Sequence, residues 1–420
     1  MEEQLREASA DSTEAITLHM AQYDDDNKAP GRIGGPIHPE LTHQLFVNER
    51  IIGYKNPHIK MFFSPASLVP YYTFNHEGLA QMTVTTTTPE RKGARRFLAT
   101  IFSKRAKEDT MDVDLSDALR TDPKEAVEPS LTDKAESMEA WTAAVASDKT
   151  YTPPGKLVTR FKVQGRSFEL YHARFADDRA AKLVRRLDIL VKMFIDGGNP
   201  IDAVEYWNLL FLFERRPTGP VLAAYSCLWE DYCHPSTRAL KLCQLLVLPP
   251  YRRMGLATRM VVSCRQVGSH LKLPVGLYTF NEPAESLQAV RLLADVIILL
   301  ETETISRLDD VRALYLKERV DSLAWKLKIE PFELSRVLIC CWAYLDTDKN
   351  RKEWNLAVRK LLYAENFEDL SLLEKSDRVK YIEKLEAVYA PMFKRVADSI
   401  GSVETVLMQT ENCLGRDDVL

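Results

Sequence analysis

The segment that most constrains the fold lies past the middle of the chain, where a strand-like run meets two prolines. Apolar residues 240–248 lead into Pro249-Pro250, then into a basic turn and a helix-like run over 254–270. Proline has no N–H to donate to a sheet, so pairing with a neighbouring strand must end or open there. An open edge leaves backbone N–H and C=O groups that an extended ligand can bind. This order of features predicts a ligand cleft.

The turn after the prolines has the chemistry of an anion site. Gly255 and Ala257 keep the backbone bare, so N–H groups can approach a ligand closely. These N–H groups and the helix dipole favour anions, particularly phosphate, at a helix start. Arg252 and Arg253 add positive charge. A glycine turn alone is common in ordinary strand-to-helix packing, so the prediction rests on the order of strand, prolines, turn and helix.

Length and composition limit the class of protein. The chain has 420 residues, 45% of them hydrophobic, and a net charge of −4, which argues against a general nucleic-acid coat. This length predicts about two to four domains. The 7 cysteines lack paired C-x-x-C spacing, which argues against zinc fingers or disulfides and for a reducing compartment. The polar start is unlike a signal or transit peptide, and no apolar run is long enough for a bilayer, so we expect a soluble, intracellular protein.

Periodicity and composition predict three domains. Residues 1–155 are expected to form an N-terminal α/β domain, residues 156–300 a mixed sheet flanked by helices, and residues 301–420 a helical domain with a loose tail. Within the first domain, the first 20 residues look frayed or weakly helical, and 23–35 looks like a loop. The predicted strands are 157–163, 167–171, 207–214, 221–229, 240–248 and 274–280, and the predicted helices of the central domain are 176–195, 254–270 and 285–294.

A charged insertion is expected at about 90–155. Its first part, 90–107, is basic, and 109–148 is mostly acidic, which is typical of helices or a partly mobile segment. The basic part fits a solvated helix face or a nuclear-import patch, and this interpretation is preferred over a nucleic-acid contact.

At this point the chain resembles the GCN5-related acetyltransferase superfamily. Its acetyl-coenzyme A motif, [R/Q]-x-x-G-x-[G/A], is matched by Arg252, Gly255 and Ala257. Dinucleotide folds are disfavoured, because their glycines follow the first strand of a βαβ unit. The resemblance implies an α+β fold with a mixed, splayed sheet flanked by helices.

The resemblance narrows to one family, the type B histone acetyltransferase catalytic subunit. Segments similar to its signatures are 38–46, 52–55, 194–196, 207–214, 246–251 and 279–283. This implies acetyl transfer from acetyl-coenzyme A to lysines in the tail of newly made histone four, in nucleus and cytoplasm. It also implies a WD40-repeat histone chaperone as partner, with no direct nucleic-acid contact and no membrane.

The resemblance also assigns residues by position. The pantetheine arm of the cofactor is expected at Leu245, Leu246 and Val247, and its pyrophosphate at Arg252, Arg253, Met254, Gly255, Leu256, Ala257 and Thr258. Ser286 stands where the family has a cofactor-contacting serine. Histone-tail contacts are expected at Asn48, Glu49, Trp229, Glu230 and Asp231, where an aromatic ring beside carboxylates suits a lysine.

The expected chemistry needs a base, because a lysine amine with a pKa of ~10.4 arrives protonated. The family's base position holds Asn281, which cannot take a proton at neutral pH. We therefore expect Glu282 to be the base, with Asp196 helping directly or through water. The alternatives are that Glu282 caps the following helix and that Asp196 is an ordinary helix-end residue.

Other interpretations follow from the same residues. Asn281 motivates a second hypothesis, a catalytically weak scaffold that binds coenzyme A and histone. A third is an acetyltransferase for another protein or amine. His38 and His43 do not have the partners of a metal site, so no metal is expected. Cys243 beside the cofactor strand is interpreted as a buried strand cysteine rather than a nucleophile.

Overall fold

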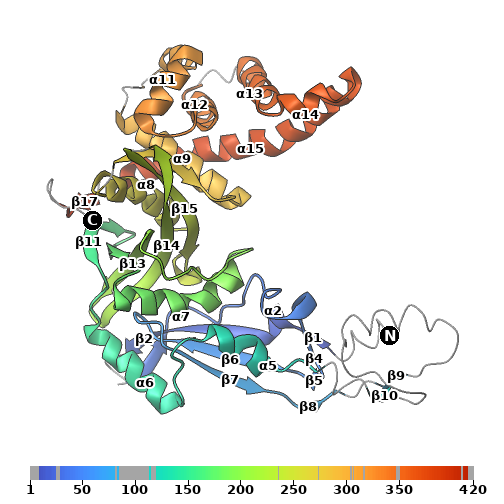
Figure 1. The fold of residues 1–420 in the computed structure, drawn as a ribbon, viewed down its shortest axis with the longest axis vertical. Helices are drawn as coiled ribbons and strands as arrows, with labels where there is room; N and C mark the ends of the chain where they lie inside the picture. The colour runs from blue at the N-terminus through green and yellow to red at the C-terminus, as the bar shows by residue number, and fades with distance from the viewer. Residues whose placement is uncertain are drawn as a thin grey trace. The chain divides into compact units, whose positions relative to one another are not determined.

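The computed structural model describes residues 9–24, 29–80, 83–84, 113–114, 120–234, 236–272, 274–302, 305, 307–315, 317–346, 351–407 and 410–414. The chain divides into two units (Figure 1). The first comprises Met1–Ser64, Leu68–Ala146 and Val184–Pro200, and the second Pro65–Ser67, Ser147–Leu183 and Ile201–Leu420.

The first unit is rich in β-structure. Its largest sheet has the order β3-β2-β6-β7, with β2 and β6 parallel and the other pairs antiparallel. These strands are β2 (Ile16–Asp24), β3 (Ala29–Arg32), β6 (His58–Phe63) and β7 (Pro70–Asn75). Shorter pairs join β1 (Ser9–Asp11) to β4 (Arg50–Ile52), β5 (Tyr54–Lys55) to β8 (Gly78–Leu79), and β9 (Thr83–Val84) to β10 (Val113–Asp114). A short helix, α2 (Ser12–Ala15), and the 3-10 helix η1 (Val47–Glu49) complete this part.

Two predictions for this unit are wrong in the described residues. Residues 1–8 lie outside the described residues, and 9–20 are not frayed: beyond the short helix α2, strand β2 pairs in parallel with β6 and buries Ile16, Leu18 and Met20. Part of the loop predicted at 23–35 is strand β3. Strand β2 depends on the distant β6, and β3 in turn pairs with β2; such pairing overrides local propensity.

The charged insertion is described only in part. Its basic run, 90–107, lies outside the described residues. The acidic part contains α5 (Pro123–Val127), the 3-10 helix η2 (Glu128–Ser130) and α6 (Met138–Ser147), as the prediction of helices expected. Trp141 of α6 packs with Phe62 at 5.5 Å between ring centroids, so this segment contributes to the first unit's core.

The second unit is built on a seven-stranded mixed sheet of order β16-β15-β14-β13-β12-β11-β17. The strands are β11 (Lys156–Val163), β12 (Arg166–Arg174), β13 (Trp207–Arg216), β14 (Gly219–His234), β15 (Thr237–Val247), β16 (Val275–Phe280) and β17 (Thr410–Asn412). Only the β15–β16 pair is parallel among these described strands. The six strands predicted over 157–280 are confirmed, whereas β17, within the predicted loose tail, was missed.

Helices follow the strands as the periodicity predicted. They are α7 (Asp178–Phe194), α8 (Leu256–Ser269), which connects the parallel strands β15 and β16, and α9 (Glu285–Thr302). A helical crossover is the usual way to join parallel neighbours. The 3-10 helices η3 (Asp148–Thr150) and η4 (Pro249–Tyr251) lie in the connections.

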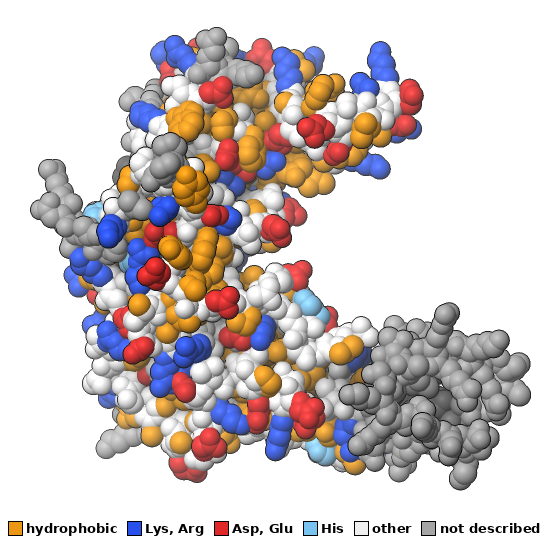
Figure 2. Space-filling model, viewed as in Figure 1, with side chains coloured by type: hydrophobic (Ala, Val, Ile, Leu, Met, Phe, Trp, Pro, Cys, Tyr) orange, Lys and Arg blue, Asp and Glu red, His pale blue; other side chains and the backbone are white. Residues whose placement is uncertain are grey.

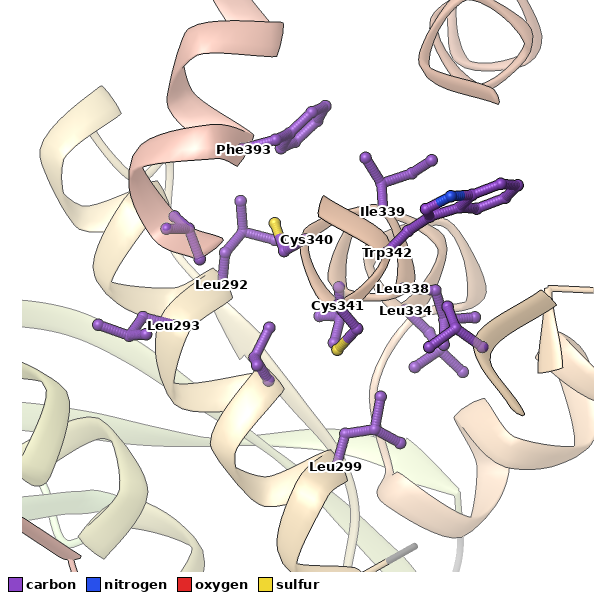
Figure 3. Close-up of a cluster of buried hydrophobic side chains, with 14 of the residues drawn as sticks. Leu292, Leu293, Leu299, Leu334, Leu338, Ile339, Cys340, Cys341, Trp342 and Phe393 are labelled. Atoms are coloured by element: carbon purple, nitrogen blue, oxygen red, sulfur yellow. The ribbon is translucent and has the colours of Figure 1, made fainter. Parts of the chain in front are cut away.

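The C-terminal region is helical and shares its core with α9. Its helices are α10 (Leu308–Leu314), α11 (Lys317–Leu327), α12 (Pro331–Leu345), α13 (Arg351–Glu365), α14 (Phe367–Ser371) and α15 (Lys375–Leu407). Figure 3 shows Leu292 of α9 lying close to Cys340 of α12 and Phe393 of α15. Cys340 and Cys341 are fully buried inside the helical region.

Two further features of the described residues are the surface charge and the apolar character of the helices. On the face drawn in Figure 2, acidic and basic side chains of the described residues are interspersed rather than gathered in one basic patch. Among the residues that the structure describes, none of the helices combines the length and apolar character that a bilayer crossing requires.

Candidate active site

The two parallel strands of the second unit separate at Leu242, seven residues before the proline pair at which the sequence predicted the opening. The β15–β16 ladder ends at the pair Leu242–Phe280, and the next residue, Asn281, donates its N–H to the Leu242 carbonyl at 2.9 Å. The ladder of β15 with β14 continues to the pair Val247–Ala224. The last residues of β15 therefore extend beyond the end of β16.

Hydrogen-bond alternation tells which residues of β15 face this opening. The Leu248 N–H donates to the Ala223 carbonyl of β14 at 2.9 Å. In an antiparallel ladder, alternate residues point toward the partner, so Leu246 also faces β14, whereas Leu245 and Val247 face away from it. Of the three residues predicted to meet a pantetheine arm, these two turn their backbone groups away from β14, and the Val247 carbonyl accepts a hydrogen bond from Nε of Arg252 at 3.3 Å.

A bulge in β15 lies at the fork between the strands. Gln244 stands opposite Cys227 and Leu242 opposite Leu228, so Cys243 is an extra residue in β15. Bulges bend a strand and are common beside active sites. Cys243 is half-buried, and burial raises the pKa of its thiol. A thiol with a raised pKa is a poor nucleophile, which supports the structural interpretation of this cysteine.

The predicted anion cradle follows directly. After η4, Arg253 and Gly255 have left-handed φ values of +64° and +71°, and α8 begins at Leu256. Gly255 is the N-cap residue and has no side chain to bond the first turn of α8, which leaves its N–H groups for a ligand. A Cβ built on Gly255 meets nothing within 4 Å, so the cradle opens into free space.

A buried charge cluster fixes the loop that carries the cradle. The Tyr251 hydroxyl donates to Glu214 at 3.0 Å, and Arg166 donates to both carboxylate oxygens of Glu214 at 2.6 and 2.8 Å. Arg166 also lies 4.7 Å from the Tyr251 ring centroid and donates to the Met254 sulfur at 3.4 Å. Burial alone would raise the pKa of Glu214, but its hydrogen bonds from Arg166 and Arg216 lower it below the usual range. Sequence analysis missed this cluster.

Three predicted residues lie where β16 runs into α9. Asn281 and Glu282 are exposed, and Glu282 has a left-handed φ of +41°. Such a conformation costs free energy in a non-glycine residue and recurs at functional sites. Within the described part of the chain, no hydrogen bond or ion pair engages the Glu282 carboxylate. Ser286 is exposed in the first turn of α9.

The other predicted acid belongs to the first unit. Asp196 comes after the end of α7, and its side chain is 82% exposed. Its carboxylate lies 3.2 Å from Nε2 of His43. The other histidine considered, His38, lies 3.2 Å from the Thr13 carbonyl through Nδ1. Among the described residues, no group of His, Cys, Asp and Glu could hold a metal ion.

The candidate tail-binding residues of the second unit lie in β14, where it pairs with the first residues of β13. Trp229 contacts Trp207 and Tyr206 edge to face, at 4.9 and 5.6 Å between centroids. The carboxylate of Glu230 accepts bonds from Arg174 and from Asn208. Glu230 is therefore held by the protein itself.

Asp231 is more accessible than Glu230. Its side chain is 45% exposed and lies 3.2 Å from Nζ of Lys241. The hydrogen bond from Lys241 lowers the pKa of Asp231. Tyr206 and Lys241, which sequence analysis did not single out, thus belong to this group. Only their pairing across neighbouring strands reveals them.

The candidate tail-binding residues of the first unit lie in η1. Asn48 and Glu49 have left-handed φ values of +53° and +55°. Glu49 accepts the Thr42 N–H at 2.7 Å, so its carboxylate is fixed, while Asn48 is exposed.

Comparison with known proteins identifies the family. The family model "Histone acetyl transferase HAT1 N-terminus" matches residues 8–196. A type B histone acetyltransferase catalytic subunit of Cryptococcus neoformans is 25% identical over 434 residues, covering 94% of this chain and 99% of that protein. The chain belongs to the type B histone acetyltransferase catalytic subunit family.

Further relatives carry the same description. A Dictyostelium discoideum type B catalytic subunit is 24% identical over 386 residues, covering 85% of this chain and 72% of its own length. One from Neurospora crassa is 25% identical over 355 residues, covering 72% of this chain and 63% of its own length. The resemblance inferred from separated motifs is thus confirmed, and with it membership of a family of histone acetyltransferases.

Proposed function

We propose that this type B histone acetyltransferase transfers acetyl from acetyl-coenzyme A to lysine side chains in the tail of newly made histone four. The observation that carries the proposal is the end of the β15–β16 ladder at Leu242–Phe280, directly before an anion cradle. The parting of these strands supports the proposed splayed sheet of a GCN5-related fold, and so does the family membership.

The residues present fit the donor. The backbone groups of Leu245 and Val247 suit the amides of an extended pantetheine arm. The uncapped first turn of α8, with Arg252 and Arg253 before it, suits a pyrophosphate. Space beside Gly255 leaves room for that group.

The chain's own groups supply the rest of the mechanism. Acetyl-coenzyme A, when bound, supplies a thioester carbonyl that a neutral amine can attack. Glu282 removes the proton from the substrate ammonium, since its carboxylate is exposed beside the fork. A backbone N–H of β15 polarises the carbonyl oxygen. Asn281 holds the loop through its bond to Leu242 and takes no proton. Asp196, which belongs to the first unit, is kept as a second proposed acid.

Trp229 and Asp231 suit a basic tail. The Trp229 ring can pack against the aliphatic stem of a lysine, and the Asp231 carboxylate attracts its positive charge. Glu230, and Asn48 and Glu49 of the first unit, are further proposed contacts of the tail. The name "catalytic subunit" in the relatives supports a partner. We propose that this partner is a WD40-repeat histone chaperone and that the protein acts in both nucleus and cytoplasm.

The deciding experiment uses the purified full chain, acetyl-coenzyme A and a histone-four tail peptide, with acetylation mapped by mass spectrometry. We expect multiple turnover on the peptide and a clear preference over unrelated amines. No turnover while both ligands bind would support the scaffold hypothesis instead. Equal turnover on unrelated amines would support an acetyltransferase with another substrate.

A further inference from the structure

Lys241 lies on the face of the sheet away from helices α8 and α9. Its neighbours Leu240 and Leu242 line a small cavity together with Val261 and Cys264 of α8. Successive side chains of a strand point to opposite faces, so the Lys241 side chain points to the other side. There it is partly exposed.

The position of Lys241 along β15 is next to the fork. It is paired with Trp229 of β14 on one side and with Thr279 of β16 on the other. The ladder ends one residue later, and the Leu242 carbonyl binds the N–H of Asn281. Lys241 therefore stands in the sheet row beside the loop that carries Glu282.

The donor's direction brings its reactive end toward this row. A pyrophosphate at the start of α8 and an arm along Val247 and Leu245 run back along β15 toward Cys243. The thioester then lies near Cys243. This residue is two positions from Lys241, which is about 7 Å along the strand at ~3.3 Å per residue. A lysine amine on a flexible four-carbon stem can cover such a distance.

Lys241 is paired with Asp231, whose carboxylate is also a proposed contact of the histone tail. Its Nζ lies 3.2 Å from Asp231, and the two side chains are 32% and 45% exposed. A partly exposed ion pair of this kind is weak and can open. Opening frees both the amine and the acid.

We propose that Lys241 is itself an acetyl acceptor in this site, an inference that rests on the proposed function. The neutral Nζ forms a bond to the thioester carbonyl carbon, the carbon–sulfur bond breaks, and coenzyme A leaves as the thiolate. The ammonium proton passes to the Glu282 carboxylate and then to water. The product is an uncharged acetyl-lysine, which can no longer pair with Asp231.

Acetylation of Lys241 changes the charge of the substrate face. It removes a positive charge and leaves the Asp231 carboxylate available to a basic peptide. The modified protein therefore binds the histone tail more tightly than the unmodified one. Self-acetylation thus prepares the site for its substrate.

The test incubates the full chain with acetyl-coenzyme A without histone and measures acetyl occupancy at each lysine by mass spectrometry. Lys360, exposed on α13, is the matched control for chemical acetylation. We expect Lys241 to be acetylated at least about tenfold faster than Lys360, at a rate independent of protein concentration. Gly255→Glu, which blocks the cradle, should abolish the difference.

A parallel arm with the tail peptide separates the two proposals. Peptide turnover with Lys241 no faster than Lys360 overturns this inference and leaves the proposed function standing. Loss of both signals overturns both. Equal Lys241 acetylation in Gly255→Glu or in heat-unfolded protein shows plain chemical reactivity and also overturns the inference.

The expected consequence has a readout that needs no acetyl transfer. Lys241→Gln, which mimics the uncharged product, should bind the tail peptide about two- to tenfold more tightly by calorimetry. Lys360→Gln should bind as the unmodified chain does. Equal or weaker binding by Lys241→Gln overturns the preparatory role.

Discussion

At the scale of single residues, the group that holds the loop and the proposed base are neighbours in the chain. Asn281 uses its backbone N–H to join β16 to β15, while Glu282 carries an exposed carboxylate on a left-handed backbone. By the resemblance, the family's base position holds the amide side chain of Asn281, and the proposed acid, Glu282, is the next residue.

The first prediction concerns this acid. Glu282→Gln keeps size and hydrogen bonding but cannot accept a proton, so turnover should fall by more than ~100-fold while acetyl-coenzyme A affinity changes little. Steady-state kinetics and calorimetry measure the two effects, with Glu285→Gln, exposed in the first turn of α9, as the matched control. Unchanged turnover would reject Glu282 as the base and direct attention to Asp196.

The second prediction concerns the cradle. Gly255→Glu places an anionic side chain where the pyrophosphate should bind, on a backbone whose φ near +71° disfavours any side chain. The affinity for acetyl-coenzyme A should therefore fall by at least ~100-fold. Gly255→Gln separates bulk and strain from charge and should bind better than the glutamate variant. Calorimetry measures affinity, and thermal unfolding checks that both variants fold. Normal affinity in the glutamate variant would refute this placement of the cradle.

At the scale of elements, sequence patterns located the strands and helices that carry the proposed site. The proline pair at 249–250 ended a strand, and the parallel ladder beside it stops at Leu242. The bulge at Cys243 and the strands β2 and β17 were not predictable, because each depends on pairing with residues distant in the chain. Local propensity cannot report such partners. The cluster around Glu214 was missed for the same reason.

The third prediction follows from that cluster. The pKa of Glu214 is lowered in the folded protein, so its pairing contributes stability above the ordinary value of 4.5 and loses it as pH falls through the lower folded value. Glu214→Gln should therefore be less stable than the unmodified chain at pH 7, and the difference should shrink toward pH 3. Urea unfolding across this pH range measures it. A difference that grew on acidification would contradict the assignment.

The fourth prediction tests the loop that the cluster holds. Tyr251→Phe removes one hydrogen bond to Glu214, worth about 1 kcal/mol, at the base of the cradle. Acetyl-coenzyme A affinity should fall by about three- to tenfold, with turnover at saturating donor nearly unchanged. Tyr344→Phe, on α12, controls for a hydroxyl removed elsewhere. A fall in saturated turnover with normal affinity would show that Tyr251 acts on catalysis and not on the cradle.

At the scale of the whole molecule, the C-terminal helices belong with the sheet that carries the site. Helix α9 begins beside Glu282 and shares its buried core with α12 and α15 (Figure 3). Buried ion pairs add to this contact, with Arg291 of α9 at 2.9 Å from Glu333 of α12. Arg291 also lies 4.7 Å from the ring centroid of Phe280, the residue before Asn281. The division of the chain at 155 and 300 stays a prediction.

The last prediction tests whether this core supports the site. Leu338 is fully buried between the helices, so Leu338→Ala should lower the free energy of unfolding by about 2–5 kcal/mol through lost burial and a cavity. Leu356→Ala, a side chain 54% exposed on α13, makes the same chemical change and should cost no more than about 0.5 kcal/mol. Urea unfolding measures both. Helix α9 begins shortly after Glu282 and shares the core that contains Leu338. Leu338→Ala should therefore also lower turnover at temperatures where it is still folded. Normal turnover despite the full loss of stability would mean that the helical core stabilises the chain without positioning the base.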